Sequence, residues 1–511
     1  MVDNQKPRVG FVFYGALVIL LIMAVVGVAV PESFFNATSA VQTFVSNRFG
    51  WYYLLIVSAF VLLCIYFIFS RYGNIRLGRP EDRPEYSYPT WFAMLFSAGM
   101  GVGLVFWSGA ETVSHYATNA PEAEVGTDQA LVDSMRYMFL HWGIHPWAIY
   151  GITAICFAYF TFRRGAPGMV SAMLSPIMNE KGVGGKVVDI IALVATVSGI
   201  ATTLGIGAAQ VSGGMAYLFD TPNNYTVQLI VIIVITILFL ISAYTGLNKG
   251  IKFLSNANIY LTIILFILML FVGPTLFSMN LFTNTIGTYL QSLPSMSFRI
   301  APTSDSAREW INAWTIFYWA WWISWSPFVG IFIARVSRGR TLKEFTIGVI
   351  LVPSIVSFIW FSLFGGATLN VQSTGLADIS SLAAEEAIFG VFDNYALSAV
   401  LSVITLLLII SFFITSADSA TFVLGMQTSN GALNPSAVVK FIWGIMLSAT
   451  AAVLLYSGGI DALQNVMIIS ALPFSIVMIL MVYSLFKALR EETDIETKDK
   501  SKNTDKPDKA S

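Results

Sequence analysis

The sequence consists largely of apolar blocks of about 20 residues, separated by short polar segments. An α-helix of that length crosses the hydrocarbon layer of a bilayer, which is roughly 30 Å thick. Only 11% of the residues are charged and 56% are hydrophobic, whereas soluble domains carry roughly a quarter charged residues. We therefore predict an all-α polytopic membrane protein with about 12 transmembrane helices.

Basic residues are segregated along the chain. Arg163, Arg164 and Arg335 belong to loops that follow even-numbered spans, whereas the loops after odd-numbered spans are acidic, as at Glu122 and Asp378. Cytoplasmic loops of membrane proteins carry the excess of Lys and Arg. The pattern predicts a multi-pass protein of the cell (cytoplasmic) membrane with both termini in the cytoplasm.

Two spans are predicted to be interrupted near the middle of the membrane. The first contains Gly99, Gly101 and Gly103, and each glycine weakens a helix by up to about 1 kcal/mol. The second covers residues 324–330 and contains Pro327, which removes a backbone donor. A close helix crossing is an alternative for the glycines. Interruptions in two matching spans, however, indicate the binding site of an inverted-repeat transporter.

The interruptions lie five spans apart, so two leading helices and two sets of five account for all the spans. Residues 281–312 are too polar to span the membrane and too apolar to lie free in water, which favours a helix on the membrane surface. The end of the chain is rich in Lys, Asp and Glu and has no apolar period. The predicted organisation is a cytoplasmic N-terminus (1–10), two leading helices and a cytoplasmic loop (11–90), a first five-helix repeat (91–280), an amphipathic connecting helix on the outer surface (281–312), a second five-helix repeat (313–490) and a disordered cytoplasmic tail (491–511).

Aromatic residues are concentrated in two spans. Tryptophan usually anchors membrane proteins at the interface, but Trp322 and Trp325 share a helix face beside Pro327, near mid-span. Several rings around one point bind a quaternary ammonium group by cation–π attraction, worth about 2 kcal/mol or more when desolvated. The residues of this pattern are Trp319, Trp321, Trp322 and Trp325 in one span and Trp142, Trp147 and Tyr150 in another.

Polar residues interrupt two further apolar blocks. Thr415, Ser416 and Asp418 follow one another within one span, and hydroxyls with backbone carbonyls are hard oxygen ligands suited to Na⁺. The alternative is that each hydroxyl bonds its own helix. That alternative is favoured for the hydroxyls of the fifth span, which are Ser198, Thr202 and Thr203.

The sequence carries no signature of a soluble enzyme. The three histidines, His115, His141 and His145, show no metal spacing backed by other ligands, and the pair His141/His145 lacks the acidic companion of a zinc protease motif. Helix packing or support of the aromatic site is their expected role. Glu111 and Asp418 are the acidic residues in or near spans, and the sequence offers no partner for either. A channel would show filter-like loops or rings of charged residues along a pore, whereas this chain shows interrupted helices instead. We predict a transporter, not an enzyme, with no nucleic-acid partner.

Together these motifs resemble the betaine/choline/carnitine transporter family over nearly the whole chain. The residues that carry the resemblance are Gly99–Gly103, the run from His141 to Tyr150, the stretch from Trp319 to Gly330 with Ala334 and Arg335, and Thr415–Ser419. The resemblance implies the five-plus-five inverted repeat shared with neurotransmitter:sodium symporters, a homotrimer in membrane lipid, and alternating access around a midplane site.

The resemblance also implies roles for individual residues. Substrate would be bound by Trp142, Trp147, Tyr150, Trp321, Trp322 and Trp325 with the glycine stretch Gly99, Met100, Gly101 and Gly103, and Trp319 would lie on the route to the site. A first Na⁺ would be held by Ser97, Met100, Phe412, Thr415 and Ser416. A second would lie near Tyr150 and Phe328, with one hydroxyl from Ser198, Thr202 or Thr203.

The expected activity is Na⁺-coupled import of glycine betaine or a related quaternary-ammonium solute, with no cofactor other than the coupling ion. Sodium-independent carnitine exchangers of the family differ in the glycine stretch and the ion sites, both of which this chain keeps. Choline carriers share the aromatic residues and many are proton-coupled. Proton-coupled choline uptake, or carnitine transport, is therefore the alternative.

Overall fold

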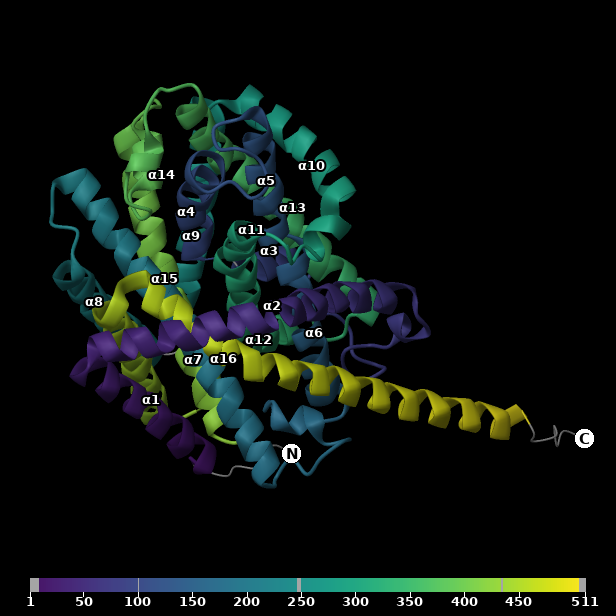
Figure 1. Cartoon of the computed structure of the whole chain (residues 1–511). Coiled ribbons are helices and arrows are strands. Elements are labelled where there is room, and N and C mark those ends of the chain that lie inside the picture. The colour runs from purple at the N-terminus through teal and green to yellow at the C-terminus, as the bar shows by residue number, and fades with distance from the viewer. Residues whose placement is uncertain (1–8, 100, 246–249, 433–434, 505–511) are drawn as a thin grey trace, which may run out of the picture.

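The computed structural model describes the backbone of residues 9–99, 101–245, 250–432 and 435–504, and the side chains of these residues except 96–99, 244–245, 250–253 and 493–504. Within these ranges the chain is helical, and its one β-bridge pairs Arg76 with Thr341. Figure 1 shows the helices packed side by side in one bundle. They are α1 (Phe11–Ala29), α2 (Pro31–Phe69), α3 (Tyr88–Gly99), α4 (Val102–Val113), α5 (Asp128–Trp142), α6 (Ile144–Ala158), α7 (Val183–Phe219), α8 (Tyr225–Thr245), α9 (Gly250–Val272), α10 (Thr275–Ser297), α11 (Asp305–Ile311), α12 (Phe317–Val336), α13 (Leu342–Ser373), α14 (Ala387–Phe392), α15 (Ser398–Thr428) and α16 (Ala437–Thr504).

The helix lengths confirm a polytopic membrane protein. Among the described residues, 10 helices are long and apolar enough to cross a bilayer. The interrupted pair α3–α4 adds a further span. Helix α16 contains two spans, because its backbone leaves the helical region at Gly458 and Gly459. The prediction of about twelve spans is therefore confirmed, whereas the relation of the two halves as an inverted repeat stays a prediction.

Three single turns of π-helix extend these spans. They are η2 (Ser114–Thr118) after α4, η3 (Tyr159–Arg163) after α6, and η5 (Asn312–Ile316) between α11 and α12. Turns of this kind are frequent at functional sites. Two of them, η2 and η5, lie next to the aromatic residues described below.

The first predicted interruption is present. Helix α3 ends at Gly99 and α4 begins at Val102, and Gly101 between them has an extended backbone, with φ −153° and ψ −147°. Met100 lies outside the described residues. The helix is therefore interrupted at this point, although the carbonyl of Gly101 accepts a hydrogen bond from the Leu104 amide at 3.1 Å.

The second predicted interruption is wrong. Helix α12 runs without a break from Phe317 to Val336 and contains Pro327. Proline removes the donor that would bond the carbonyl of Ile323. The hydroxyl of Ser326 donates to that carbonyl at 2.8 Å and so satisfies it.

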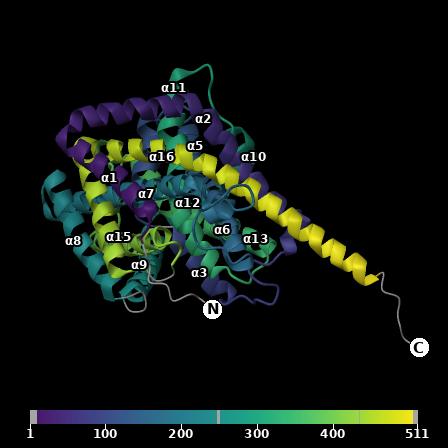
Figure 2. The same ribbon diagram turned by 90° about the horizontal axis from the view of Figure 1, so that it is seen from below.

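The connecting segment and the C-terminal tail are also described differently by the structure than by the sequence. The connecting segment 281–312 contains two helices: α10 begins before it, at Thr275, and α11 begins at Asp305. Arg308 of α11 donates to the carbonyls of Ser46 and Asn47, both at 3.0 Å, and so joins α11 to α2. The tail from 491 is helical up to Thr504, where α16 projects beyond the bundle (Figure 2). Residues 505–511 lie outside the described residues.

Loops predicted to share the cytoplasmic side contact one another. The backbone of Leu77, which follows α2, pairs at 2.9 Å with Gly339 and Arg340, which follow α12. Asp82 forms an ion pair at 3.0 Å with Arg338. Basic loops separated by more than 250 residues are thus packed together, as a shared side of the membrane requires.

Candidate functional site

The predicted aromatic residues of α5 and α12 form one ring cluster. The rings of Trp321 and Trp322 are parallel, with centroids 5.4 Å apart and 3° between their planes. Trp142 of α5 stands perpendicular to Trp322, at 5.0 Å and 78°. Gly103 of α4 faces this cluster, because a Cβ on Gly103 would lie 2.9 Å from Trp142 and 3.1 Å from Trp321. The absence of a side chain at position 103 therefore allows the two rings to approach α4.

A narrow cavity lies between these rings and the interrupted span. Its volume is about 10 Å³, which is room for about one water molecule. A larger guest can enter only if the rings separate. The cavity is lined by Gly101, Val102, Gly103, Trp142, Thr203, Trp321, Trp322 and Trp325.

Three of the predicted residues lie further from the cavity. Tyr150 contacts Trp322 at a centroid distance of 5.9 Å, and Trp147 contacts Tyr150 at 5.6 Å. Trp319, predicted on the route to the site, stacks instead on His145 at 5.1 Å. The cavity lining therefore includes Trp142, Trp321, Trp322 and Trp325 but not these three.

Tyr318 belongs to the ring cluster and was missed in the sequence. Its ring is nearly parallel to those of Trp321 and Trp322, each at 6.1 Å. The available signal was its spacing, because a residue three or four positions before another shares its helix face.

Glu111 has several partners, so the expectation that it lacks one is wrong. It is fully buried on α4, and its Oε2 accepts hydrogen bonds from Trp142 Nε1 at 3.1 Å and from the Tyr318 hydroxyl. Its Oε1 lies 2.6 Å from His141 Nδ1 and 3.2 Å from His115 Nε2. One carboxylate therefore orients two rings of the cluster and two histidines. The general rule that intramembrane carboxylates are functional was the available signal.

The expected support role of His141 is also found. Its ring stacks on Tyr318 at 4.6 Å, and its backbone carbonyl accepts a hydrogen bond from Trp322 Nε1 at 2.9 Å.

Asp418, for which the sequence offered no partner, also has one, because Ser242 donates to it at 2.6 Å.

The residues of the first predicted ion site whose side chains the structure describes lie on α15. Thr415 of α15 bonds its own helix, donating to the carbonyls of Ser411 at 3.0 Å and Phe412 at 3.1 Å, as the alternative reading of its hydroxyl expected. Ser416 Oγ lies 3.8 Å from the Cβ position of Gly101. Ser416 is therefore adjacent to the interrupted span, and the ion site as a whole stays a prediction. The side chain of Ser97 and all of Met100 lie outside the described residues.

Asn258 of α9 extends this group and was not predicted. Its Nδ2 donates to Thr415 Oγ1 at 3.0 Å, while its Oδ1 is buried without a hydrogen-bond partner. An unsatisfied buried acceptor beside a hydroxyl is a suitable oxygen for a cation.

The second predicted ion site is not gathered at one point. Ser198 and Thr202 bond carbonyls of their own helix, at 2.9 and 2.8 Å, and Thr202 also bonds Leu463 of α16 at 3.0 Å. Thr203 also bonds its own helix, donating to the Gly199 carbonyl at 3.3 Å, and in addition lines the cavity and accepts from Trp321 Nε1 at 3.3 Å. None of the described contacts joins these hydroxyls to Tyr150 or Phe328, so this site stays a prediction.

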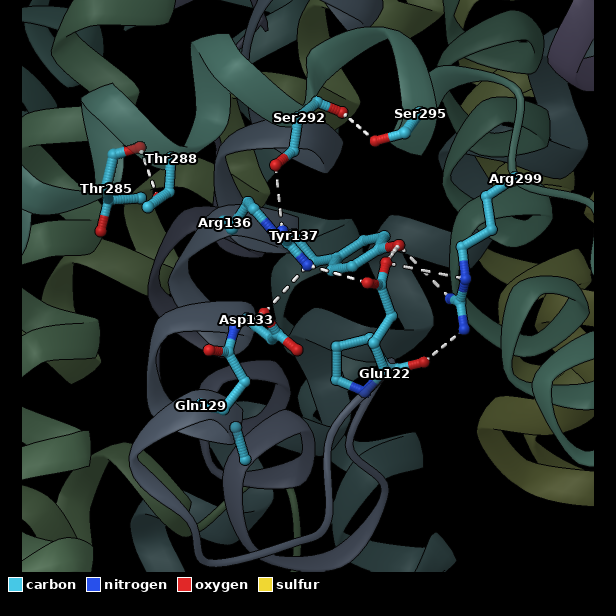
Figure 3. A network of polar contacts seen from close by, with 12 residues as sticks. Glu122, Gln129, Asp133, Arg136, Tyr137, Thr285, Thr288, Ser292, Ser295 and Arg299 are labelled. Atoms are coloured by element: carbon cyan, nitrogen blue, oxygen red, sulfur yellow. Dashed lines mark hydrogen bonds and ion pairs between the residues drawn. The ribbon is translucent and has the colours of Figure 1, made fainter.

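A polar network joins the acidic loop after η2 to α5 and to Arg299 (Figure 3). Glu122 pairs with Arg136 at 3.1 Å and with Arg299 at 3.7 Å, and Tyr137 donates to the same carboxylate. The guanidinium of Arg299 lies over Trp310 at 5.5 Å, and Trp310 packs on His115 at 5.0 Å. Charged, aromatic and histidine layers therefore separate the acidic loop from the cavity.

The comparison with known families decides what kind of protein has this site. The family model described as "BCCT, betaine/carnitine/choline family transporter" matches residues 11–494. The chain belongs to this family. It is therefore a transporter rather than an enzyme, and it is a multi-pass membrane protein.

Curated relatives match the transporter over nearly its whole length. It is 55% identical over 503 residues to "Glycine betaine transporter OpuD" of Bacillus subtilis, covering 98% of each chain. It is 41% identical to the "Probable glycine betaine transporter" of Desulfitobacterium hafniense, with 96% and 99% covered. It is 40% identical to the "Ectoine/hydroxyectoine transporter" of Virgibacillus pantothenticus, with 95% and 97% covered.

Proposed function

We propose that this transporter imports glycine betaine, or a closely related quaternary-ammonium solute, by Na⁺ symport with alternating access. The observation that carries the proposal is the ring cluster of Trp142, Trp321 and Trp322 packed against the interruption between α3 and α4. The names of the relatives from Bacillus and Desulfitobacterium support a betaine-type substrate.

The rings suit the methylated end of such a substrate. A trimethylammonium group carries a positive charge but no hydrogen-bond donor, so a carboxylate gives it no directed bond, whereas ring faces attract it directly. The carboxylate of Glu111 would not bind the trimethylammonium group, because its Oε2 already accepts hydrogen bonds from Trp142 and Tyr318. The backbone amides at the start of α4, a position where a helix leaves amides without intrahelical partners, would receive the substrate carboxylate.

The position of the interruption supplies a route for coupling. On one side, Gly101 lies beside Ser416 of the first predicted ion site, and two residues later Gly103 lies beside the rings. An ion held by Phe412, Thr415 and Ser416 would fix the same short segment that the substrate needs. Binding of the ion would therefore raise the affinity for substrate, and the reverse follows by linkage.

The remaining features of the proposal follow the family. The protein would lie in the cell membrane with both termini cytoplasmic, in agreement with the basic loops that contact one another around Leu77 and Arg340. It would work as a homotrimer surrounded by membrane lipid. The second Na⁺ would lie near Tyr150 and Phe328, with a hydroxyl of α7.

Uptake into proteoliposomes tests the proposal. Labelled glycine betaine is offered under an imposed Na⁺ gradient or an imposed proton gradient, with unlabelled choline, carnitine and ectoine as competitors. We expect uptake that follows the Na⁺ gradient and resists choline. Uptake that follows the proton gradient, or that choline outcompetes, would favour proton-coupled choline transport instead. Protein carrying Trp322→Leu serves as the control for uptake that does not pass through the ring cluster.

A further inference from the structure

The group formed by Glu111, His115 and His141 has the composition of a metal site. All three side chains are fully buried, and their ligand atoms lie within 4.8 Å of one another. The two histidine nitrogens are 2.6 and 3.2 Å from Glu111 Oε1. In a tetrahedral zinc site with bonds of about 2.0–2.2 Å, neighbouring ligand atoms are separated by roughly 3.3 Å. The two distances to Glu111 Oε1 are therefore slightly shorter than in such a site, and the three ligand atoms, all within 4.8 Å of one another, are close enough to surround one ion after small adjustments.

The hydrogen bonds around the group permit both histidines to act as ligands. His141 Nε2 lies 3.1 Å from the Thr315 hydroxyl, which can accept a hydrogen bond. His141 can then keep its proton on Nε2 and present Nδ1 to an ion, an arrangement that is typical of metal-bound histidines. His115 Nδ1 is buried without a partner, so its proton can reside there while Nε2 faces Glu111.

The side chains around the group favour a cation over other ligands. The walls are the rings of Trp310, Trp314 and Tyr318, at centroid distances of 4.5 to 5.0 Å from one or other histidine. Ring faces carry partial negative charge. Imidazole and carboxylate ligands together suit zinc and similar transition metals, whereas magnesium prefers oxygen ligands alone.

We propose that Glu111, His115 and His141 bind one transition-metal ion of the Zn²⁺ type between the outer polar network and the ring cluster, and that the bound ion inhibits transport. The two oxygens of Glu111 would have different partners. Oε1 would join the ion, while Oε2 keeps its bonds to Trp142 and Tyr318. An ion at this point would lock α4 and η2 to α5 and hold the rings that a substrate must separate.

The ion would reach the site from the side of the polar network. His115 belongs to η2, and the loop that follows η2 contains Glu122. Glu122 pairs with Arg136 and Arg299 of the polar network. Trp310 lies between Arg299 and His115 and closes this path. Opening of the network during alternating access would therefore admit the ion. This last step rests on the proposed function, whereas the binding itself does not.

Zinc binding to the purified full-length protein tests the site without any substrate. Equilibrium dialysis with Zn²⁺ should give one ion per chain, and Mg²⁺ in excess should not displace it. His115→Ala should weaken binding at least about 10-fold, because loss of a ligand costs no less than loss of a second-shell partner. The third histidine supplies a matched control, since His145 is buried but bonds Ser297 at 2.9 Å outside the group. His145→Ala should bind zinc like the unchanged protein.

A second variant and a transport assay separate the possible outcomes. Glu111→Gln removes the charged ligand with little change in volume, and thermal unfolding shows whether each variant is folded. No stoichiometric zinc binding, or equal weakening by His115→Ala and His145→Ala, would overturn the site. Zinc should also inhibit uptake in the unchanged protein, and His115→Ala should raise the half-inhibiting concentration at least about 10-fold. Zinc binding without inhibition would retain the site and refute the inhibition.

Discussion

A methyl group added at Gly103 should impair substrate binding more than one added at Gly101. The new Cβ at position 103 would lie 2.9 Å from Trp142 and 3.1 Å from Trp321, closer than van der Waals contact allows. Overpacking of this kind costs about 1–3 kcal/mol. If that cost falls on the geometry that binds substrate, affinity decreases roughly 5- to 150-fold. At Gly101 the nearest atom is 3.8 Å away and φ is −153°, so alanine fits there without strain.

Isothermal titration of glycine betaine into purified protein measures this difference. Both substitutions add one methyl group near the start of α4. Gly101 precedes the helix and Gly103 lies inside it, so helix propensity favours alanine only at position 103, which works against the loss of affinity expected there. Gly103→Ala should bind betaine more weakly than Gly101→Ala, while both variants keep the melting temperature within a few degrees. Equal affinities in the two variants would refute the placement of the substrate between Gly103 and the rings.

Three further substitutions address the rings, the ion site and the buried carboxylate. Trp322→Leu keeps much of the packing volume but loses the ring face, so betaine affinity should fall about 30-fold or more, by titration calorimetry; unchanged affinity would rule out this ring as a ligand. Thr415→Ala combined with Ser416→Ala should raise the Na⁺ concentration for half-maximal uptake, and an unaltered Na⁺ dependence would place the ion elsewhere. Glu111→Gln weakens the acceptor of two ring donors by about 1 kcal/mol, so affinity should fall about 5-fold; full affinity would show that the charge is not needed to orient the rings.

Most of the fold could be predicted because length and hydrophobicity decide it. A segment such as α1 has the length and apolarity of a span, and no tertiary contact is needed to recognise it. The error at Pro327 has a different origin. Whether a proline breaks a helix depends on what satisfies the freed carbonyl, and here the Ser326 hydroxyl does so. That outcome depends on a side-chain rotamer, which the sequence alone does not specify.

The site was predictable where its residues share a helix face. Trp325 lies four positions after Trp321 and three after Trp322 on α12, and a rule of spacing is enough to pair it with each of them. Glu111 was not predictable in this way, because its partners Trp142 and Tyr318 lie 31 and 207 residues further along the chain. Asn258 was missed for the same reason, since it meets Thr415 only through the packing of α9 on α15.

The parallel rings of Trp321 and Trp322 also give the protein an optical signal of its own. Indole emission depends on the surroundings of the ring, and these two rings now lie face to face at 5.4 Å beside a cavity of about 10 Å³. A guest that enters must move the rings apart, so that each indole then has the guest as a neighbour in place of another ring. Intrinsic fluorescence can therefore follow the occupancy of the site in unlabelled protein, during turnover.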